Sequence, residues 1–248
     1  MFDIKKNLGV QSYCFRGFKP LGELIAQIKG IGLDRTEVCG VHVNFDDDAT
    51  FADAIGRFNQ AGVAISSIGV QTFKGDVAKE EKWFAFARAA GASMISVNFD
   101  VSHVPGVLVS TEKLADKYDL LLGIHNHGGY HWLGSSQMVE QVLSVTGERV
   151  GLCLDTAWCL QSGEDPLKWV EQFGKKLFGV HVKDFVFDRA GKWEDVVVGT
   201  GNLKLKEFMA AALATPRLAA VTLEYEGDVN GPGPKLKECV DAIRAATA

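Results

Sequence analysis

The sequence predicts a single-domain (β/α)8 barrel, the TIM-barrel architecture, over residues 1–248. A helical pattern, a glycine and a short β-rich run recur along the chain. The β-rich runs are nearly continuous in apolar and small residues, which is typical of parallel strands buried on both faces. Eight βα units in about 250 residues match the usual size of this barrel. A doubly wound open sheet is the alternative, because alternation alone does not prove closure.

The expected elements alternate strictly, so that each strand precedes a helix. The expected strands cover residues 9–15, 34–40, 63–70, 93–100, 120–127, 149–155, 177–184 and 219–228. The expected helices cover residues 21–32, 51–62, 80–91, 112–119, 138–145, 166–176, 203–214 and 235–247. No Pro-rich or Gly/Ser-rich linker interrupts the series, which indicates one domain.

Composition and charge exclude several classes of protein. The chain is 47% hydrophobic with a net charge of −5, so it lacks the basic surplus typical of general nucleic-acid or membrane-surface binders. No apolar run approaches the roughly 18 to 20 residues that span a bilayer. The first residues do not resemble a signal peptide, and the five cysteines contain no CxxC motif. We therefore expect a cytoplasmic protein with reduced, mainly buried thiols.

Polar residues close the apolar runs, at the end of the predicted barrel where active sites lie. Solubility alone would scatter charges over the outer faces of the helices. The residues at the expected strand ends are instead Glu37, Asn98, His125, Asn126, His127, Asp155, His181, Lys183, Asp184 and Glu224.

Three of these residues indicate a metal site. Asp155, His181 and Glu224 each follow three or more mainly apolar strand residues. Divalent ions such as Mn²⁺, Mg²⁺ or Co²⁺ favour oxygen ligands with one or two imidazoles. Each residue also has an ordinary structural interpretation, as a helix N-cap, a hydrogen-bonded core histidine and a surface carboxylate respectively. Their occurrence as a set at strand ends favours the metal interpretation.

The whole chain resembles the sugar phosphate isomerase/epimerase group of xylose-isomerase-like TIM barrels, which also contains endonuclease IV, ketose 3-epimerases and inosose dehydratases. The phrases that carry the resemblance are GLDRTEV, GIHNHGG, VGLCLDTAW, LFGVHVKD, VGTGNL and TLEYEG. The resemblance implies one divalent ion held by a strand-5 Glu, a strand-6 Asp, a strand-7 His and a strand-8 Glu. Asp155, His181 and Glu224 match the last three.

The sequence departs from this pattern at the fourth ligand. His125 stands where the resemblance implies a glutamate, whereas Asn126 and His127 keep the rest of the phrase. Imidazole binds the same metals, so we predict His125 as the fourth ligand. The expected cofactor is one divalent ion, Mn²⁺, Mg²⁺, Co²⁺ or Zn²⁺.

A second departure concerns endonuclease IV. Its multi-zinc relatives place a histidine three residues after the strand-6 aspartate, where this chain has Trp158. Few strand-end histidines remain for further metals, and the acidic balance suits DNA poorly. We therefore expect a small sugar as the binding partner, with no nucleic acid and no membrane. Oligomeric state stays open, although the resemblance implies that barrels of this group often pair as homodimers.

The resemblance also implies the chemistry. The metal would polarise the carbonyl of a keto-sugar while a base removes the proton from the neighbouring carbon, which gives an enediolate. The predicted catalytic residues are Glu224 as base, with His127 and Lys183. Lys183 lies two residues after His181, so an extended strand places both on the same side. The predicted substrate contacts are Glu37, Asn126, Trp158 and Lys183.

Replacement of the strand-5 glutamate by His125 leaves three functions open. The first prediction is a metal-dependent isomerase or epimerase of a ketose or related keto-sugar. The second is a lyase or dehydratase of a keto-sugar, keto-inositol or keto-glycoside, because an enediolate can expel a β-hydroxyl or β-alkoxyl group with one dominant base. The third is a non-catalytic sugar-binding barrel, because a fold does not fix a function.

Overall fold

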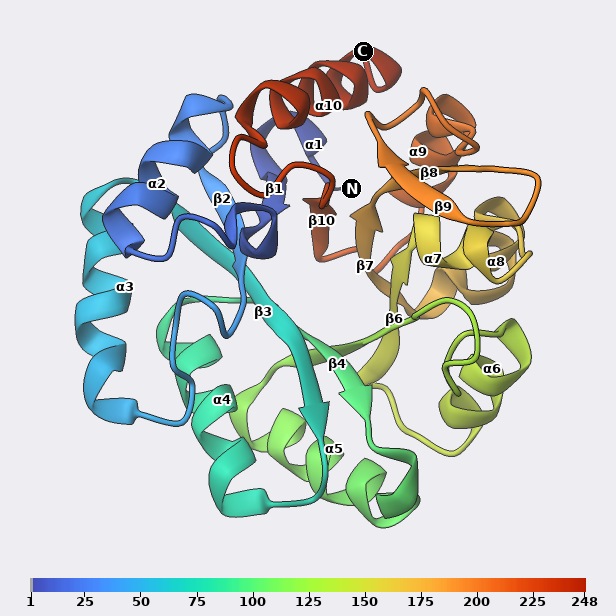
Figure 1. Cartoon of the computed structure of the whole chain (residues 1–248). Coiled ribbons are helices and arrows are strands. Elements are labelled where there is room, and N and C mark those ends of the chain that lie inside the picture. The colour runs from blue at the N-terminus through green and yellow to red at the C-terminus, as the bar shows by residue number, and fades with distance from the viewer. Residues whose placement is uncertain (1) are drawn as a thin grey trace.

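Eight parallel strands close into a barrel with the helices around it, as the sequence predicts (Figure 1). This computed structural model describes residues 2–248. The strand order around the barrel is β1-β10-β7-β6-β5-β4-β3-β2. The barrel strands are β1 (Leu8–Gln11), β2 (Arg35–Val38), β3 (Ala64–Phe73), β4 (Met94–Phe99), β5 (Leu121–His125), β6 (Val150–Asp155), β7 (Leu177–Val182) and β10 (Ala220–Leu223).

Closure of the barrel is visible in the pairing of β1, the first strand. Val10 pairs with Thr36 of β2 on one side and with Leu223 of β10 on the other. An open doubly wound sheet would leave two unpaired edges, so that alternative is wrong.

The α-helices lie around the barrel, and eight of them agree with the helices expected from the sequence (Figure 1). Among residues 2–248, none of them combines the length and the apolar character needed to cross a bilayer. They are α1 (Ile4–Asn7), α2 (Leu21–Gly30), α3 (Phe51–Gln60), α4 (Val77–Ala89), α5 (Gly106–Tyr118), α6 (Ser136–Ser144), α7 (Thr156–Gln161), α8 (Pro166–Phe173), α9 (Leu205–Leu213) and α10 (Gly233–Ala246).

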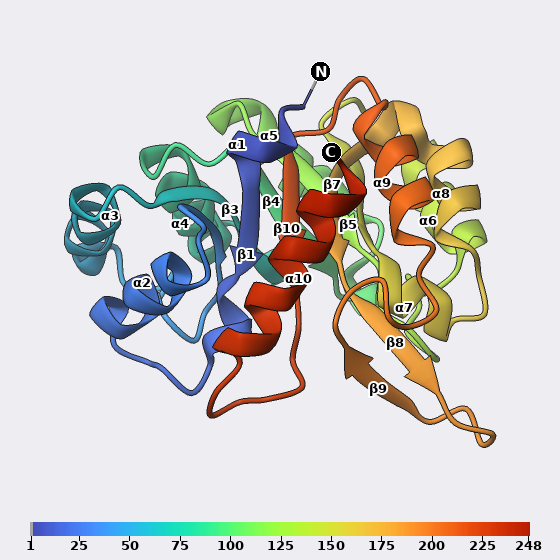
Figure 2. The same cartoon turned by 90° about the horizontal axis from the view of Figure 1, so that it is seen from above.

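The short helices α1 and α7 were not expected from the sequence, and two further local features differ from the prediction. The first strand ends at Gln11, where a 3-10 helix (Ser12–Phe15) begins and the Gln11 side chain accepts a hydrogen bond from the backbone N–H of Tyr13. The second feature is an antiparallel hairpin of β8 (Asp184–Phe187) and β9 (Trp193–Val196), which projects beyond the barrel (Figure 2). Phe185 stacks on Trp193 with ring centroids 4.6 Å apart, so cross-strand aromatic packing stabilises the hairpin.

The apolar core has two parts. A large cluster contains the inward faces of the helices and the strand residues that they cover. A small cluster of Met94, Cys153, Phe178 and Ala220 joins four strands, of which β4 and β10 are not neighbours in the barrel. Side chains from such distant strands meet only inside the barrel, so this cluster fills its interior.

Candidate metal centre and reaction pocket

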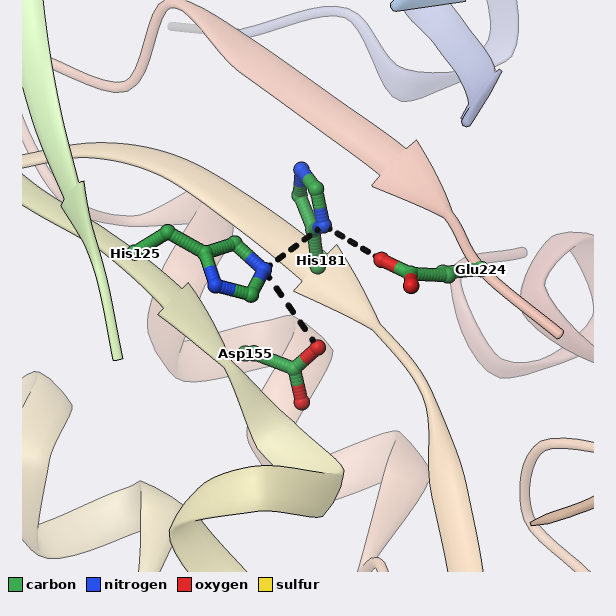
Figure 3. A group of neighbouring side chains, drawn as sticks. All are labelled: His125, Asp155, His181 and Glu224. Atoms are coloured by element: carbon green, nitrogen blue, oxygen red, sulfur yellow. Dashed lines mark hydrogen bonds and ion pairs between the residues drawn. The ribbon is translucent and has the colours of Figure 1, made fainter. Parts of the chain in front are cut away.

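Four side chains from four adjacent strands converge at the carboxyl end of the barrel (Figure 3). His125 and Asp155 are the last residues of β5 and β6, His181 lies near the end of β7, and Glu224 directly follows β10. All four are buried, and one ligand atom from each lies within 4.8 Å of the others. We call these residues the four-ligand cluster.

The distances within the four-ligand cluster are short. His125 Nε2 lies 3.1 Å from His181 Nδ1 and 3.6 Å from Asp155 Oδ2. His181 Nδ1 in turn lies 2.6 Å from Glu224 Oε2. An imidazole nitrogen carries at most one proton, so these nitrogens and oxygens cannot all be satisfied by hydrogen bonds to one another.

The cluster fits one divalent metal ion. Metal–ligand bonds of about 2.0–2.2 Å allow ligand atoms up to roughly 4.4 Å apart, close to the span seen here. Asp155 Oδ2 is buried and has no hydrogen-bond partner among residues 2–248. Two imidazole nitrogens with two carboxylate oxygens form a donor set that suits Mn²⁺, Co²⁺ or Zn²⁺. The residues present therefore match the metal ligands that the sequence predicts.

Glu37 supports the cluster from the opposite side of the barrel. Its carboxylate accepts hydrogen bonds from Gln11 Nε2 at 2.6 Å, Ser67 Oγ at 2.5 Å and Ser96 Oγ at 2.7 Å. His181 Nε2 lies 3.1 Å from Glu37 Oε1, close enough for charge attraction although the two groups are not aligned for a hydrogen bond. Glu37 is fully buried and hydrogen-bonded, so it has a supporting position in this structure, and the predicted substrate contact stays a prediction.

Asn126 also has a supporting position. Its side-chain amide donates to the backbone carbonyl of Asp155 at 3.0 Å and accepts from the backbone N–H of Asp155 at 2.8 Å. Asn126 is fully buried and both ends of its amide are used, so it fixes the end of β6, and the predicted substrate contact stays a prediction. Asp155 Oδ1 caps α7 by accepting from the N–H of Trp158, which leaves Oδ2 for the cluster.

Lys183 lies between two carboxylates. Its Nζ is 3.2 Å from Glu224 Oε1 and also forms an ion pair with Glu226. Glu224 therefore directs one oxygen toward His181 and the other toward Lys183, which places His181 and Lys183 on the same side of the chain as strand alternation predicts. Glu226 was not among the predicted site residues, although the same alternation from Glu224 would have identified it.

The electrostatics of the cluster follow from burial and charge. Burial raises the pKa of Asp155 to about 7. Burial and the neighbouring His181 hold the pKa of His125 well below its usual value. Burial would lower the pKa of His181, but the combined effects of Glu37, Cys153 and Glu224 raise it well above its usual value. Burial opposes ionisation of Lys183 as well, but Glu224 and Asp155 raise its pKa. The site thus collects negative charge around His181, an environment that attracts a cation.

The other two histidines of GIHNHGGYHW extend outward from the cluster. The rings of His125 and His127 lie 4.8 Å apart between centroids, and those of His127 and His131 lie 4.9 Å apart. Burial, with a smaller effect of His131, lowers the pKa of His127 to about 4, so its imidazole is neutral near pH 7. His131 accepts a hydrogen bond from the N–H of Leu133 and is half-buried, which is a structural role.

A pocket of about 470 Å³ opens above the cluster, and we call it the reaction pocket. Residues that line it include Gln11, Tyr13, His125, His127, Trp158, Glu224 and Glu226. Trp158 packs edge-on against Phe185 and Trp193 of the hairpin, and Lys183 Nζ lies 5.3 Å from its ring centroid. A larger pocket of about 780 Å³ lies around Arg35 and Asn59, at the other end of the barrel and away from these titratable groups.

Comparison with known proteins places this geometry in a family. A family model described as xylose isomerase-like TIM barrel matches residues 108–246, which is more than half of the chain. The chain is a member of this family. Residues 108–246 contain all four members of the four-ligand cluster, so the match includes the site itself.

Two relatives match about half of the chain. The chain is 36% identical over 137 residues to the rhizopine catabolism protein MocC of Rhizobium meliloti, covering 50% of this chain and 42% of that protein. It is 25% identical over 137 residues to a 3-oxo-isoapionate decarboxylase of Pectobacterium atrosepticum, covering 49% and 48% respectively. The matches thus span less than half the length of either relative.

A solved structure matches this chain over its full length. It is a xylose isomerase-like TIM barrel protein from Mycobacterium smegmatis in complex with magnesium, with a TM-score of 0.79, 14% identity and 100% coverage of both chains. At this identity the likeness shows the shared fold alone.

Proposed function

We propose that the protein is a divalent-metal-dependent isomerase or epimerase that acts on a ketose or related keto-sugar through an enediolate of the substrate. The observation that carries the proposal is the convergence of four ligand atoms beneath a polar pocket at the carboxyl end of the barrel. Membership of the xylose isomerase-like family supports it, because the four predicted ligands lie in the matched region.

The metal would be held by His125, Asp155, His181 and Glu224. A divalent ion at this position would polarise a substrate carbonyl and make the neighbouring C–H group more acidic. The magnesium complex of the Mycobacterium smegmatis protein agrees with an ion in a barrel of this fold. We propose Mn²⁺, Co²⁺ or Zn²⁺ ahead of Mg²⁺ for this chain, because two of its four ligands are imidazoles.

The protein's own groups supply the proton transfers. Glu224 lines the reaction pocket and is the proposed base for the proton beside the carbonyl, while Lys183 holds its Oε1 in position. His127 follows β5, which is separated from β10 by β7 and β6, so it faces the pocket from another side. His127 is neutral near pH 7, so it would donate a hydrogen bond on that side while a water molecule returns the proton. Return of the proton from that side would invert the carbon, which is epimerisation. Trp158 excludes water along the pocket wall.

A lyase or dehydratase is the second candidate, and His125 is the observation that favours it. Where the resemblance implies a second glutamate, this chain has an imidazole 3.1 Å from His181. One dominant base with an acid beside the leaving group suits elimination of a β-hydroxyl or β-alkoxyl group. One relative is named as a 3-oxo-isoapionate decarboxylase, and a decarboxylase is itself a lyase.

Solvent-deuterium exchange tests the proposed function. The purified protein would be analysed for its metal content, stripped with a chelator and reloaded with Mn²⁺, Co²⁺, Zn²⁺ or Mg²⁺. We expect metal-dependent uptake of deuterium beside the carbonyl of at least one ketose or keto-glycoside. Elimination products without epimerised product would favour the lyase. Exchange above background that is equal with and without metal would contradict the metal dependence. No exchange above background with tightly bound substrate would support a sugar-binding barrel instead.

Glu224→Gln provides the matching variant. It keeps the shape and one oxygen of the side chain but removes the base, so turnover should fall by roughly 10² or more. Metal content should be measured in parallel, because Glu224 Oε2 belongs to the four-ligand cluster. Near-normal turnover in a metal-loaded variant would assign proton abstraction to another residue.

A further inference from the structure

A second pocket adjoins the reaction pocket at the carboxyl end of β2 and β3. It has a volume of about 390 Å³, and Gly40 lines both pockets. Strand β3 continues from one to the other, because Gly69 and Val70 line the reaction pocket and Gln71 and Thr72 line the second pocket. The two pockets are therefore neighbours, with Gly40 and the carboxyl end of β3 between them.

Two polar side chains of the second pocket are available to a ligand. Gln71 and Thr72 make no side-chain hydrogen bond within the described part of the chain, and both reach solvent. The amide of Gln71 donates and accepts hydrogen bonds, and so does the hydroxyl of Thr72. These groups match the alternating donors and acceptors of a hydroxyl-rich ligand.

The charges of the second pocket compensate one another. Asp46 Oδ2 lies 2.8 Å from Lys79 Nζ, and Asp46 Oδ1 accepts from Trp83 Nε1 at 3.1 Å. The neighbouring Lys82 lies 3.2 Å from Asp48. Among residues 2–248, the lysine that lines this pocket is thus already paired, so the pocket favours a neutral group over a phosphate or a carboxylate.

An aromatic wall completes the second pocket. Trp83 packs edge-on against Phe73 with ring centroids 5.0 Å apart, and its indole N–H is fixed by Asp46. Phe45 lines the same pocket and packs edge-on against Phe86. An ordered aromatic surface beside a few free hydrogen-bonding groups is the usual composition of a small-molecule site.

The two pockets have similar sizes. Each falls near the lower part of the roughly 300–1,000 Å³ range of ligand sites, so each suits one small ring and its substituents. The four-ligand cluster lies under the reaction pocket only. A substrate that fills both pockets would therefore place one ring over the reacting groups and a second ring outside them.

We propose that the second pocket binds the second ring of a neutral, two-ring keto-glycoside whose ketose ring occupies the reaction pocket. The assignment rests on the proposed function, because it takes the reaction pocket as the place where a keto-sugar binds. The proposed substrate class is a keto-glycoside whose aglycone is a sugar or another hydroxyl-rich ring.

Calorimetry on the Mn²⁺-loaded protein tests the assignment, because binding does not require turnover. The probes are a 3-keto disaccharide of two glucose units and 3-keto-glucose. We expect the disaccharide to bind at least about tenfold more tightly, the scale of one or two added hydrogen bonds with some apolar burial. In the double variant Gln71→Ala/Thr72→Ala, the ratio of the two affinities should fall roughly fivefold or more.

Asn59→Ala is the matched control, because Asn59 lines the pocket at the other end of the barrel. It should leave the ratio of affinities unchanged. Equal affinity for the two probes in the unmodified protein, or an equal loss for both probes in the double variant, would overturn the second-ring assignment. Tight and selective disaccharide binding without any metal-dependent deuterium exchange would overturn the proposed function and leave the assignment intact.

Discussion

His125 ends β5 with its imidazole directed at His181 and Asp155, and the proposed ligand set depends on this one side chain. The substitution His125→Glu replaces a nitrogen donor by a negatively charged oxygen donor. We expect the variant to keep metal and to shift its preference toward Mg²⁺ or Mn²⁺ by about tenfold relative to Zn²⁺, because harder ions favour carboxylates. It should also lose any lyase activity faster than proton exchange. Titration with competing metals and deuterium exchange measure the two effects.

The control is His131→Glu, the same substitution at the outer, half-buried histidine of this stretch. It should leave the metal preference unchanged. If His125→Glu behaved like this control, His125 would lie outside the coordination of the metal, and its role would be contact with substrate or packing.

Glu226 is the residue-scale feature that the sequence analysis missed. Its carboxylate lines the reaction pocket and pairs with Lys183, which in turn holds Glu224. In Glu226→Gln, Lys183 loses its ion pair with Glu226 and keeps its contact with Glu224. The positive charge of Lys183 then acts more strongly on Glu224, which makes Glu224 a weaker base. We expect kcat/KM to fall by roughly tenfold or more, mainly through kcat.

Metal affinity distinguishes this role from a purely structural one. It should stay within about threefold in Glu226→Gln, because Glu226 is not a member of the four-ligand cluster. Glu194→Gln, an exposed glutamate on the neighbouring hairpin, should leave both kcat and metal affinity unchanged. A large loss of metal with an unchanged kcat of the loaded protein would contradict the role given to Glu226.

At the scale of elements, the interior of the barrel depends on glycines that face bulky side chains. A Cβ atom at Gly179 of β7 would lie 2.9 Å from both Cys153 Sγ and Met94 Cε. Gly179→Ala should therefore destabilise the protein by about 1–3 kcal/mol through overpacking. Urea unfolding at constant metal concentration measures the change.

Gly56→Ala is the matched control and should have the opposite sign. Gly56 lies within α3, and a Cβ there meets nothing within 4 Å. Alanine should stabilise this helix by about 0.5–1 kcal/mol, because glycine loses more backbone entropy on folding. Similar effects of the two substitutions would mean that the barrel interior tolerates an added methyl group.

The order and type of the barrel elements could be predicted because periodicity is a local property of the sequence. The β8–β9 hairpin could not, because its stability comes from Phe185 stacking on Trp193, eight residues away. The predicted end of β1 was also wrong, because the turn after Gln11 depends on a hydrogen bond between its side chain and the backbone of Tyr13. Such contacts form only once the chain is folded, and residue types alone do not reveal them.

The site residues likewise could be predicted as a group but not in their individual roles. Residues at strand ends were predicted as a group, and four of them do meet in the four-ligand cluster. Their individual roles depend on geometry, and this is why Glu37 and Asn126 were assigned to substrate contact although both are buried and hydrogen-bonded to other parts of the barrel. Glu226 was not predicted because it lies two residues beyond Glu224, the last predicted ligand, where the apolar strand has already ended.

At the scale of the whole molecule, all eight barrel strands contribute to one polar network. Strands β5, β6, β7 and β10 supply the four-ligand cluster, and β2 supplies Glu37. The partners of Glu37 come from β1, β3 and β4, namely Gln11, Ser67 and Ser96. The approach of His181 Nε2 to Glu37 Oε1 at 3.1 Å joins the two halves. A metal bound by the cluster would thus stabilise the closed barrel as a unit.

This linkage predicts how stability depends on metal. At a concentration about 100-fold above Kd, Mn²⁺ should stabilise the protein by about 2.7 kcal/mol, which corresponds to a rise in Tm of roughly 5–10 °C for a chain of this size. Asp155→Asn should abolish this rise, because the amide is a poor substitute for the carboxylate ligand. Without metal the variant should be as stable as the unmodified protein or more so, because asparagine still caps α7 while one buried charge is removed.

Asp165→Asn separates loss of metal from loss of a helix cap. Asp165 caps α8 through the N–H of Leu167, just as Asp155 caps α7 through that of Trp158, but it lies outside the four-ligand cluster. It should keep the full metal-dependent rise in Tm, measured by scanning calorimetry with and without chelator. A rise that survives in Asp155→Asn would place the ion elsewhere, and the convergence of the four side chains would then be a packing feature of the barrel. Loss of the rise in Asp155→Asn alone would show that the four strands bearing the ligands are held together by the ion that they bind.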